Sequence, residues 1–517
     1  MRKWLIRLIV VGFGLTLVIP SRAEDLRLAN LFSDHMVLQR EKPVPVWGWA
    51  KPGEEVTVEF AERKAKARAD ANGRWMVTLD PMPASTEGHD LVTHSSREEK
   101  KLTITDVVVG DVWLCSGQSN MHFGMKRVEN AKAEIAAANN PAIRFFYVKE
   151  QFAQQPADHV EGEWKPISPE TVVNCSAVAY YFASALQEKL GVPIGLLLSS
   201  VGGTRIETWM RQETLSDLGI AGRLIDQWKN VSPAEFEEIN TAYRAYQAER
   251  DRPTRQLTPA AEDPGAAASV EPKRPTLRCH DCPGALHNCM IAPLQPFAIR
   301  GALWYQGEAN IGSPGGYEKM LPALITDWRR VWGDKMPFLI VQLAPHKSTT
   351  PAFREAQFRV SQKTPHTAMV VTTDVGHAED IHPTRKRPVG ERLALAARAV
   401  AYGERVEVSG PVFKSLKIDG RVAVVSFSHA EAGLKAEGGP LKGFTIAGKD
   451  GKFIAADAEI RGSTVVVSSE QIDRPVAVRY GWDNVPDVNL FNREGLPAVP
   501  FRSDQPGDQS RLADPKH

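Results

Sequence analysis

The sequence predicts an α/β domain, built on a parallel β-sheet, between two modules that consist of β-strands alone. In the middle of the chain, short apolar runs alternate with longer stretches of helical periodicity. On either side of that region, short runs instead alternate between apolar and polar residues. Continuous apolar strands that are separated by helices are typical of a parallel sheet covered by helices on both faces.

Residues 24–105 are expected to form the first all-β module, in the manner of a small sandwich. Its short alternating runs are separated by the turn signals Pro52-Gly53 and Asn72-Gly73. The clearest strand candidates are Val44 to Trp49, Val56 to Phe60 and Arg74 to Leu79.

Residues 106–405 are expected to form the α/β domain. The strand candidates are Val107 to Leu114, Ile194 to Leu198, Ile299 to Trp304, Phe338 to Leu343 and Met369 to Thr372. The helix candidates between them are Ala177 to Leu190, Tyr317 to Trp332 and Val389 to Tyr402. An insertion at residues 210–285 interrupts the alternation of strands and helices. Its part from Arg250 to Pro275 is rich in Pro, Ala and charged residues, and we expect it to be a mobile surface segment.

The second β module is expected at residues 406–500, where alternation returns in Val422 to Phe427 and Thr464 to Val467. The polar residues 501–517 are expected to form a disordered tail.

The first residues, 1–23, have the pattern of a secretory signal peptide: a basic start, an apolar run and small residues at the end. We expect cleavage after Ala23 and export to the periplasm or the extracellular space of a bacterium, with no stable membrane insertion afterwards. The alternative is an uncleaved membrane anchor.

Charge and cysteine usage exclude some classes of function. The chain has 63 basic and 62 acidic residues, a net charge of +1, which leaves no electrostatic footprint for nucleic acid. Five cysteines occur, and Cys279-x-x-Cys282 lies near His280, His287 and Cys289. Zinc is one reading of this cluster, but the irregular spacing favours a local disulfide or free thiols. We therefore expect no metal.

Four polar clusters each follow the end of a predicted strand, where reactive residues of a parallel sheet belong. They are Gly117 to Met121, Ser199 to Thr204, Trp304 to Asn310 and Glu379 to Pro383. Singly, each could be a helix cap or a solvated loop. Together they supply a nucleophile (Ser119), oxyanion donors (glycine N–H groups and Gln306), a carboxylate (Glu308) and a base (His382), which is the set that acyl transfer requires.

Three of these clusters, together with Asp34 to Gln39, resemble the sialate O-acetylesterase family of the SGNH hydrolase superfamily. The resemblance covers nearly the whole chain after residue 23. It implies a flavodoxin-like three-layer fold, no cofactor, and hydrolysis of acetyl esters on sugar hydroxyls. By position it implies that Ser119 is the nucleophile and His382 the base, and that the oxyanion hole consists of the Ser119 N–H, the Gly203 N–H and the Gln306 side chain.

The third member of the triad stays open at this point. The superfamily often places its acid three residues before the histidine, where this chain has Glu379. Asp380 is only two residues before it, and Glu308 resembles the acid of related acetylxylan esterases. We expect Glu308 to hydrogen-bond the imidazole, with Asp380 and Glu379 as alternatives.

The sequence thus predicts an exported carbohydrate O-acetylesterase whose partner is an acetylated carbohydrate. Sialic acid, xylan and pectin all remain possible carriers of the acetyl group. A catalytically silent sugar-binding protein is the alternative from another class. A third possibility is an esterase for apolar acyl chains, although no apolar lid segment is evident.

Overall fold

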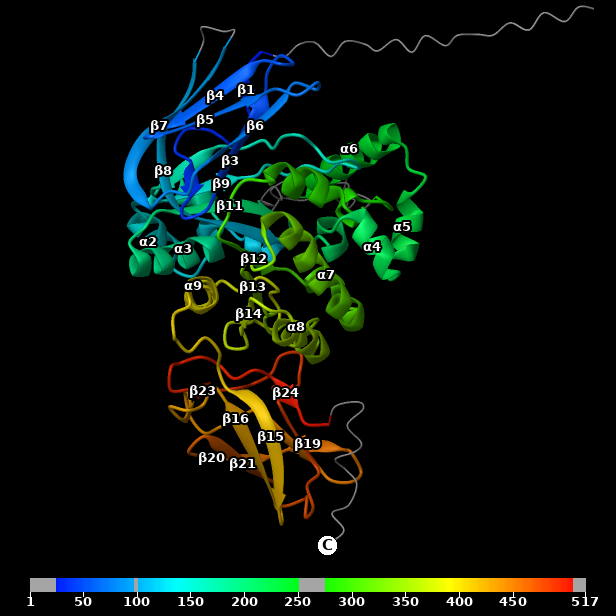
Figure 1. The fold of residues 1–517 in the computed structure, drawn as a ribbon. Coiled ribbons are helices and arrows are strands. Elements are labelled where there is room, and N and C mark those ends of the chain that lie inside the picture. The colour runs from blue at the N-terminus through cyan, green and yellow to red at the C-terminus, as the bar shows by residue number, and fades with distance from the viewer. Residues whose placement is uncertain (1–24, 97–100, 251–274, 505–517) are drawn as a thin grey trace, which may run out of the picture.

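Figure 1 shows the computed structural model of the chain, which describes residues 25–96, 101–250 and 275–504. The expected signal peptide, residues 251–274 of the expected mobile segment and the end of the tail beyond residue 504 lie outside the described residues. Within the described ranges, no helix is long and apolar enough to cross a membrane.

The central sheet has the order β10-β9-β11-β8-β12-β13-β14. Its strands are β8 (Lys101–Gly117), β9 (Asn140–Tyr147), β10 (Trp164–Ile167), β11 (Ile194–Ser200), β12 (Gly301–Tyr305), β13 (Phe338–Val341) and β14 (Thr367–Val370). All neighbours from β9 to β14 are parallel, and β10 is an antiparallel edge strand. The five strands predicted from apolar runs stand in the order 2-1-3-4-5, which is that of a flavodoxin-type sheet.

Helices cover both faces of this sheet (Figure 1). On one face α3 (Ala177–Leu190) packs against α9 (Arg387–Tyr402), and on the other α7 (Pro314–Trp332) packs against α8 (Pro351–Lys363). The three helices predicted from the sequence are therefore confirmed. The remaining α-helices of the described residues are α1 (Ser119–His122), α2 (Ala131–Ala137), α4 (Gln212–Leu218), α5 (Gly222–Trp228) and α6 (Pro233–Arg250).

The N-terminal β module shares a strand with the α/β region. Its strands are β1 (Arg27–Leu28), β2 (Val37–Gln39), β3 (Val44–Trp49), β4 (Glu55–Phe60), β5 (Arg63–Arg68), β6 (Arg74–Leu79) and β7 (Ser85–Ser95). The first half of β8 pairs with β7 and β2, while its second half pairs with β11 and β12. The expected boundary at residues 105 and 106 thus falls inside one strand, and the two parts share one hydrophobic core.

The segment from Asp34 to Gln39 fastens β8 in place. The Asp34 carboxylate accepts from the Thr105 N–H at 2.6 Å, and the His35 ring contacts Asp106 at 2.7 Å. The buried Gln39 amide donates to Asp111 at 2.9 Å. This motif is therefore structural, because it orients the strand that precedes the Ser119 turn.

The C-terminal β module has a hydrophobic core of its own. Its strands are β15 (Val412–Asp419), β16 (Val422–Ser428), β17 (Leu434–Ala436), β18 (Phe444–Ala447), β19 (Phe453–Ala455), β20 (Asp457–Arg461), β21 (Thr464–Ser468), β22 (Ala477–Tyr480), β23 (Leu490–Asn492) and β24 (Phe501–Arg502). Because β24 pairs with β22, the expected start of the tail at residue 501 is wrong. The Arg502 guanidinium also binds Glu355 of α8 at 3.1 Å, which docks the module on the α/β region.

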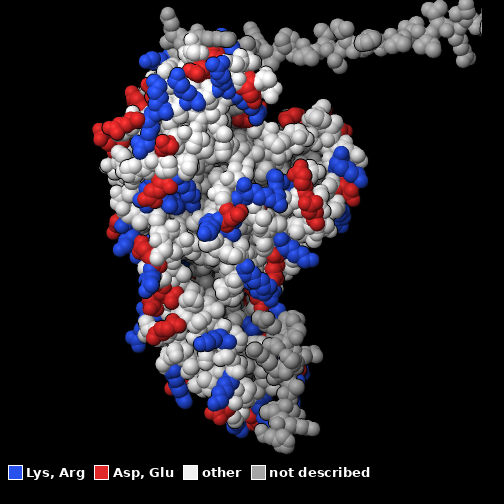
Figure 2. All heavy atoms as spheres, in the orientation of Figure 1, with Lys and Arg blue, Asp and Glu red and all other residues white. Residues whose placement is uncertain are grey.

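Positive and negative side chains are mixed on the face of the molecule that Figure 2 shows. Figure 2 shows blue and red side chains interspersed on the face in view, without a large area of one sign. This distribution agrees with the near-zero net charge.

Candidate active site

The nucleophile turn lies where three strands end side by side. In the sheet register, Gly117 of β8 is opposite Ser200 of β11 on one side and Tyr305 of β12 on the other. Gly117 has φ +136°, and a Cβ at this position would lie 2.2 Å from the Tyr305 carbonyl oxygen. Only glycine fits this approach, which lets the Gln118 N–H donate to the Tyr305 carbonyl at 3.0 Å and places Ser119 at the start of α1.

Ser119 and His382 meet although 263 residues separate them. The Ser119 Oγ and the His382 Nε2 are 2.8 Å apart, within hydrogen-bond reach for a nucleophile and its base. Burial lowers the pKa of His382, and the positive charges of Arg127 and Lys386 lower it further. The ring is therefore held in the neutral form that can accept a proton.

Asp380 is the carboxylate that lies against His382. Its Oδ1 accepts from the backbone N–H of His382 at 2.8 Å and is 3.8 Å from the ring Nδ1. The loop therefore turns sharply enough for an acid two residues before the histidine to reach the ring. Glu379 points elsewhere, since its carboxylate pairs with the Lys347 ammonium at 2.5 Å and is largely exposed.

Glu308 lies in the site but does not take the expected position on the imidazole. Its Oε1 accepts from the Asn120 Nδ2 at 2.5 Å, and Asn120 also donates to the Ile381 carbonyl at 3.0 Å. The expected hydrogen bond between Glu308 and His382 is thus replaced by one to Asn120, the residue after the nucleophile. Glu308 is linked to the histidine loop through Asn120, which also donates to the Ile381 carbonyl.

A buried lysine completes this network. The Lys386 Nζ donates to the Asn120 Oδ1 at 2.5 Å, and the side chain is 1% exposed. Burial lowers the pKa of Lys386 to about 7 and raises the pKa of Glu308. This role could not be predicted from the sequence, because Lys386 belongs to the basic run Arg385-Lys386-Arg387, which is typical of a solvated surface.

Gln306 is buried, and the nitrogen of its amide already has hydrogen-bond partners within the protein. Its Nε2 lies 2.8 Å from the Asn310 Oδ1, 3.1 Å from the Thr204 carbonyl and 3.2 Å from the Gln118 Oε1. An amide nitrogen carries only two hydrogens, so these protein acceptors use both of them. The expected role of the Gln306 side chain as an oxyanion donor does not fit this arrangement, in which Gln306 ties three strand-end loops together.

Two other expected donors do stand free beside the nucleophile. A Cβ on Gly202 would lie 3.4 Å from the Ser119 Cβ, so the Gly202-Gly203 turn borders Ser119. Among the described residues, the backbone N–H groups of Ser119 and Gly203 donate to no protein carbonyl. Unpaired N–H groups at a helix start and a glycine turn are suited to an anionic oxygen.

The cysteine cluster lies away from this chemistry. All five cysteines are buried free thiols, so of the two alternatives favoured by the sequence, a local disulfide or free thiols, the structure has the free thiols. Burial raises the pKa of Cys279, Cys282 and Cys289. Within residues 25–96, 101–250 and 275–504, no group of three or more His, Cys, Asp or Glu side chains is arranged to hold a metal ion.

Comparisons with known proteins identify the family of this chain. The profile of the family described as carbohydrate esterase, sialic acid-specific acetylesterase, matches residues 109–254 and 285–399. A sialate O-acetylesterase of Mus musculus is 29% identical over 546 residues, covering 95% of this chain and 97% of its own. The Homo sapiens sialate O-acetylesterase is 28% identical, covering 98% of this chain and 100% of its own.

A solved structure extends the similarity to three dimensions. A carbohydrate acetylesterase from Xanthomonas citri superimposes with a TM-score of 0.78 at 37% identity, covering 93% of this chain and 99% of its own. The matched family segments contain the Ser119 turn, the Glu308 cluster and His382. The chain therefore belongs to the sialic acid-specific acetylesterase family of carbohydrate esterases.

Proposed function

We propose that this chain is a carbohydrate O-acetylesterase of the SGNH hydrolase type, in which Ser119 is the nucleophile, His382 the general base and Asp380 the acid that orients the base. The observation that carries the proposal is the 2.8 Å approach of the Ser119 Oγ to the His382 Nε2. Family membership supports the acetyl ester as the bond that is cleaved.

The proposed reaction has two halves. The Ser119 hydroxyl attacks the acetyl carbonyl while His382 takes its proton, and the N–H groups of Ser119 and Gly203 bind the oxyanion. As the C–O bond to the sugar breaks, His382 returns the proton to the sugar oxygen. Water then attacks the acetyl-serine, again with His382 as base, and releases acetate and free Ser119.

Asp380 stabilises the imidazolium that forms in each half. Its Oδ1 faces the ring Nδ1 at 3.8 Å, on the side opposite the nitrogen that meets Ser119. A modest closure of this gap in the substrate complex would complete the contact, since catalytic hydrogen bonds are often long without substrate. Asn120 donates to the Ile381 carbonyl and is itself held by Glu308 and Lys386. These hydrogen bonds fix the position of the loop that carries His382.

Replacement of the nucleophile tests the function. Ser119→Ala is expected to lower kcat for 4-nitrophenyl acetate by roughly 10³-fold or more, because no other hydroxyl of the described residues hydrogen-bonds His382. Ser216→Ala, a change of the same kind on exposed α4, is the control and should keep full activity. Near-normal turnover by a folded Ser119→Ala protein would remove Ser119 from the mechanism. Wild-type protein that binds acetylated glycans without releasing acetate would instead favour the sugar-binding alternative.

The substrate and the location of the enzyme belong to the same proposal. The acetyl carrier is a glycan, and a panel of acetylated sialic acid, xylan and pectin assayed for released acetate identifies it. The apolar run before Ala23 supports export as a soluble mature protein that begins at Glu24. N-terminal sequencing checks this, and a retained Met1 would contradict it.

A further inference from the structure

A cavity of about 820 Å³ adjoins the proposed active site. It is lined by His122, Arg127 and Tyr147, among others. His122 lies in the same short helix as Ser119, and its Nδ1 is 3.0 Å from the Ser200 carbonyl. The Arg127 guanidinium lies 4.3 Å from the centre of the Phe123 ring, and the centre of the His382 ring lies 6.5 Å from the same ring. One end of the cavity therefore borders the catalytic pair.

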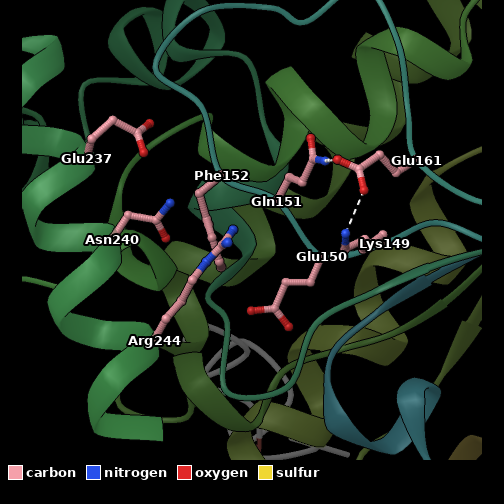
Figure 3. Close-up of a pocket in the computed structure, with 8 residues that line it drawn as sticks. All are labelled: Lys149, Glu150, Gln151, Phe152, Glu161, Glu237, Asn240 and Arg244. Carbon is pink, nitrogen blue, oxygen red and sulfur yellow. Dashed lines mark hydrogen bonds and ion pairs between the residues drawn. The ribbon is translucent and has the colours of Figure 1, made fainter. Parts of the chain in front are cut away.

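A second cavity, of about 240 Å³, continues the first. Lys149 and Glu161 line both cavities and form an ion pair of 2.6 Å at the junction. Figure 3 shows that the far wall of the second cavity comes from helix α6, through Glu237, Asn240 and Arg244. The two cavities thus form one groove, which starts beside Ser119, follows the chain after β9 and ends at α6.

Asn240 marks the distal end as a place for a polar ligand. This side chain is only 5% exposed, and its Oδ1 has no hydrogen-bond partner among the described residues. Its amide faces the centre of the cavity in Figure 3. Because a buried acceptor without a donor is unfavourable, a ligand hydroxyl that donates to Asn240 would be bound with a net gain.

The charges around the distal cavity favour an uncharged ligand. Three carboxylates line it, Glu150, Glu161 and Glu237, against the two cations of Lys149 and Arg244. Since Lys149 is paired with Glu161, an additional anionic group would meet a surplus of negative charge. Hydroxyl groups, in contrast, can donate to carboxylates and accept from Arg244.

An aromatic residue bridges the two ends of the groove. Tyr147 is 37% exposed, a large value for a tyrosine at a strand end, and its ring meets the His122 ring at 5.9 Å. Phe152 lines the distal cavity, and the five residue steps from Tyr147 to Phe152 span at most about 18 Å. An amphipathic ring at this point offers an apolar surface to a sugar ring while its hydroxyl stays in water.

We propose that this groove binds an acetylated oligosaccharide chain, with the acetylated unit at Ser119 and an uncharged, hydroxyl-rich sugar unit of the same chain held by Asn240 and Glu237 at α6. The proposal rests on the proposed function, and it adds that the substrate is a chain of several sugar units and not a free monosaccharide.

The experiment compares kcat/KM for acetylated neutral oligosaccharides of increasing length, from xylan and from glucomannan, with kcat/KM for 4-nitrophenyl acetate. The ratio of the two is expected to rise with chain length until the groove is filled. Glu237→Gln and Asn240→Ala should each lower the ratio for the long chains by roughly three- to tenfold, the value of one lost hydrogen bond. Glu238→Gln, the same change on the neighbouring exposed residue of α6 outside the cavity, should leave the ratio unchanged.

The outcomes separate this proposal from the proposed function. If Ser119→Ala keeps its activity on every substrate, the esterase assignment fails irrespective of the groove. If Ser119 is required but the ratio is independent of chain length, or if Glu237→Gln behaves like Glu238→Gln, the groove is not the glycan site. If acetylated oligogalacturonides of matched length have the higher ratio, the distal end selects anions and the assignment to a neutral sugar is wrong.

Discussion

The three candidate acids of the triad differ in the partner that each carboxylate binds. Glu379 is neutralised by Lys347 in solvent, and Glu308 is committed to Asn120. Asp380 alone faces the ring, although its side chain remains more than half exposed. At the scale of single residues, the partner of a carboxylate decides its role more than its distance from histidine along the sequence.

The acid assignment predicts which of two variants, Asp380→Asn and Glu379→Gln, loses more activity. Asp380→Asn should lower kcat by at least roughly tenfold, below the ~10⁴-fold loss known for a fully buried triad acid, because Asp380 is partly solvated. Glu379→Gln should be close to wild type, since its contact with Lys347 is on the surface. Steady-state kinetics on 4-nitrophenyl acetate measure the order. A Glu379→Gln loss that exceeds that of Asp380→Asn would reverse the assignment.

The pH profile of kcat/KM should respond to the charges that face His382, which are Arg127, Lys386, Asp380 and His346. The pKa of His382 is lowered mainly by burial and secondly by Arg127. Arg127→Gln removes a positive charge, so the imidazolium becomes less unfavourable, the pKa rises, and the acidic limb of the profile moves to higher pH. Asp380→Asn removes a negative charge and should move that limb to lower pH.

These opposite shifts are measured with a small uncharged ester, so that Arg127 does not act through substrate binding. Two shifts in the same direction would show that His382 is not the group that titrates.

At the scale of the elements, the close contact of α3 and α9 sets the spacing of one helical layer. A Cβ on Gly390 of α9 would lie 2.5 Å from the Tyr181 Cβ and 2.7 Å from the Phe182 nitrogen, both in α3. These atoms belong to or adjoin the backbone and cannot move independently. The layer therefore depends on this glycine, and α9 begins only five residues after His382.

Gly390→Ala is expected to destabilise the protein by about 1–3 kcal/mol, because the added methyl overpacks the α3–α9 contact. Gly222→Ala in α5 is the matched control, since its added Cβ would meet no atom within 4 Å. That control should be neutral or slightly stabilising, as expected for glycine removed from a helix. Chemical denaturation of both variants measures the difference, and equal stabilities would mean that α3 and α9 adjust freely.

At the scale of the whole molecule, the described residues form two hydrophobic cores and not three. The N-terminal β module and the α/β region share the first, because β8 runs through both. The C-terminal module has the second and contacts α8 through the Arg502–Glu355 pair. Each core should unfold as one cooperative unit, because the parts that share a core lose their packing together.

Calorimetry should therefore resolve two unfolding transitions. Ile446→Ala in the C-terminal core should lower one of them, and Leu324→Ala in the large core should lower the other, each by about 2–5 kcal/mol of unfolding free energy. A single transition that both variants lower equally would show that the docking contact couples the two cores.

The sequence by itself predicted most strands of the central sheet and the two residues that we propose as nucleophile and base. Apolar runs and helical periodicity are local properties, so β11, β12 and α3 could be predicted from them. The rule that parallel strands present their carboxyl ends at one edge was enough to bring Ser119 and His382 together. Strand β9 was not expected, because its apolar run Ile143-Arg144-Phe145-Phe146 is short and contains a charge.

Only the tertiary structure decided which polar group binds which. Glu308 accepts a hydrogen bond from Asn120, and the Gln306 amide nitrogen binds acceptors in neighbouring loops. Lys386 is buried and donates to Asn120. The groove to α6 likewise joins segments from distant parts of the chain. The formation of a hydrogen bond depends on the donor–acceptor distance to within tenths of an ångström and on which acceptors lie nearby. The spacing of residues in the sequence predicts only the strand end near which a side chain lies.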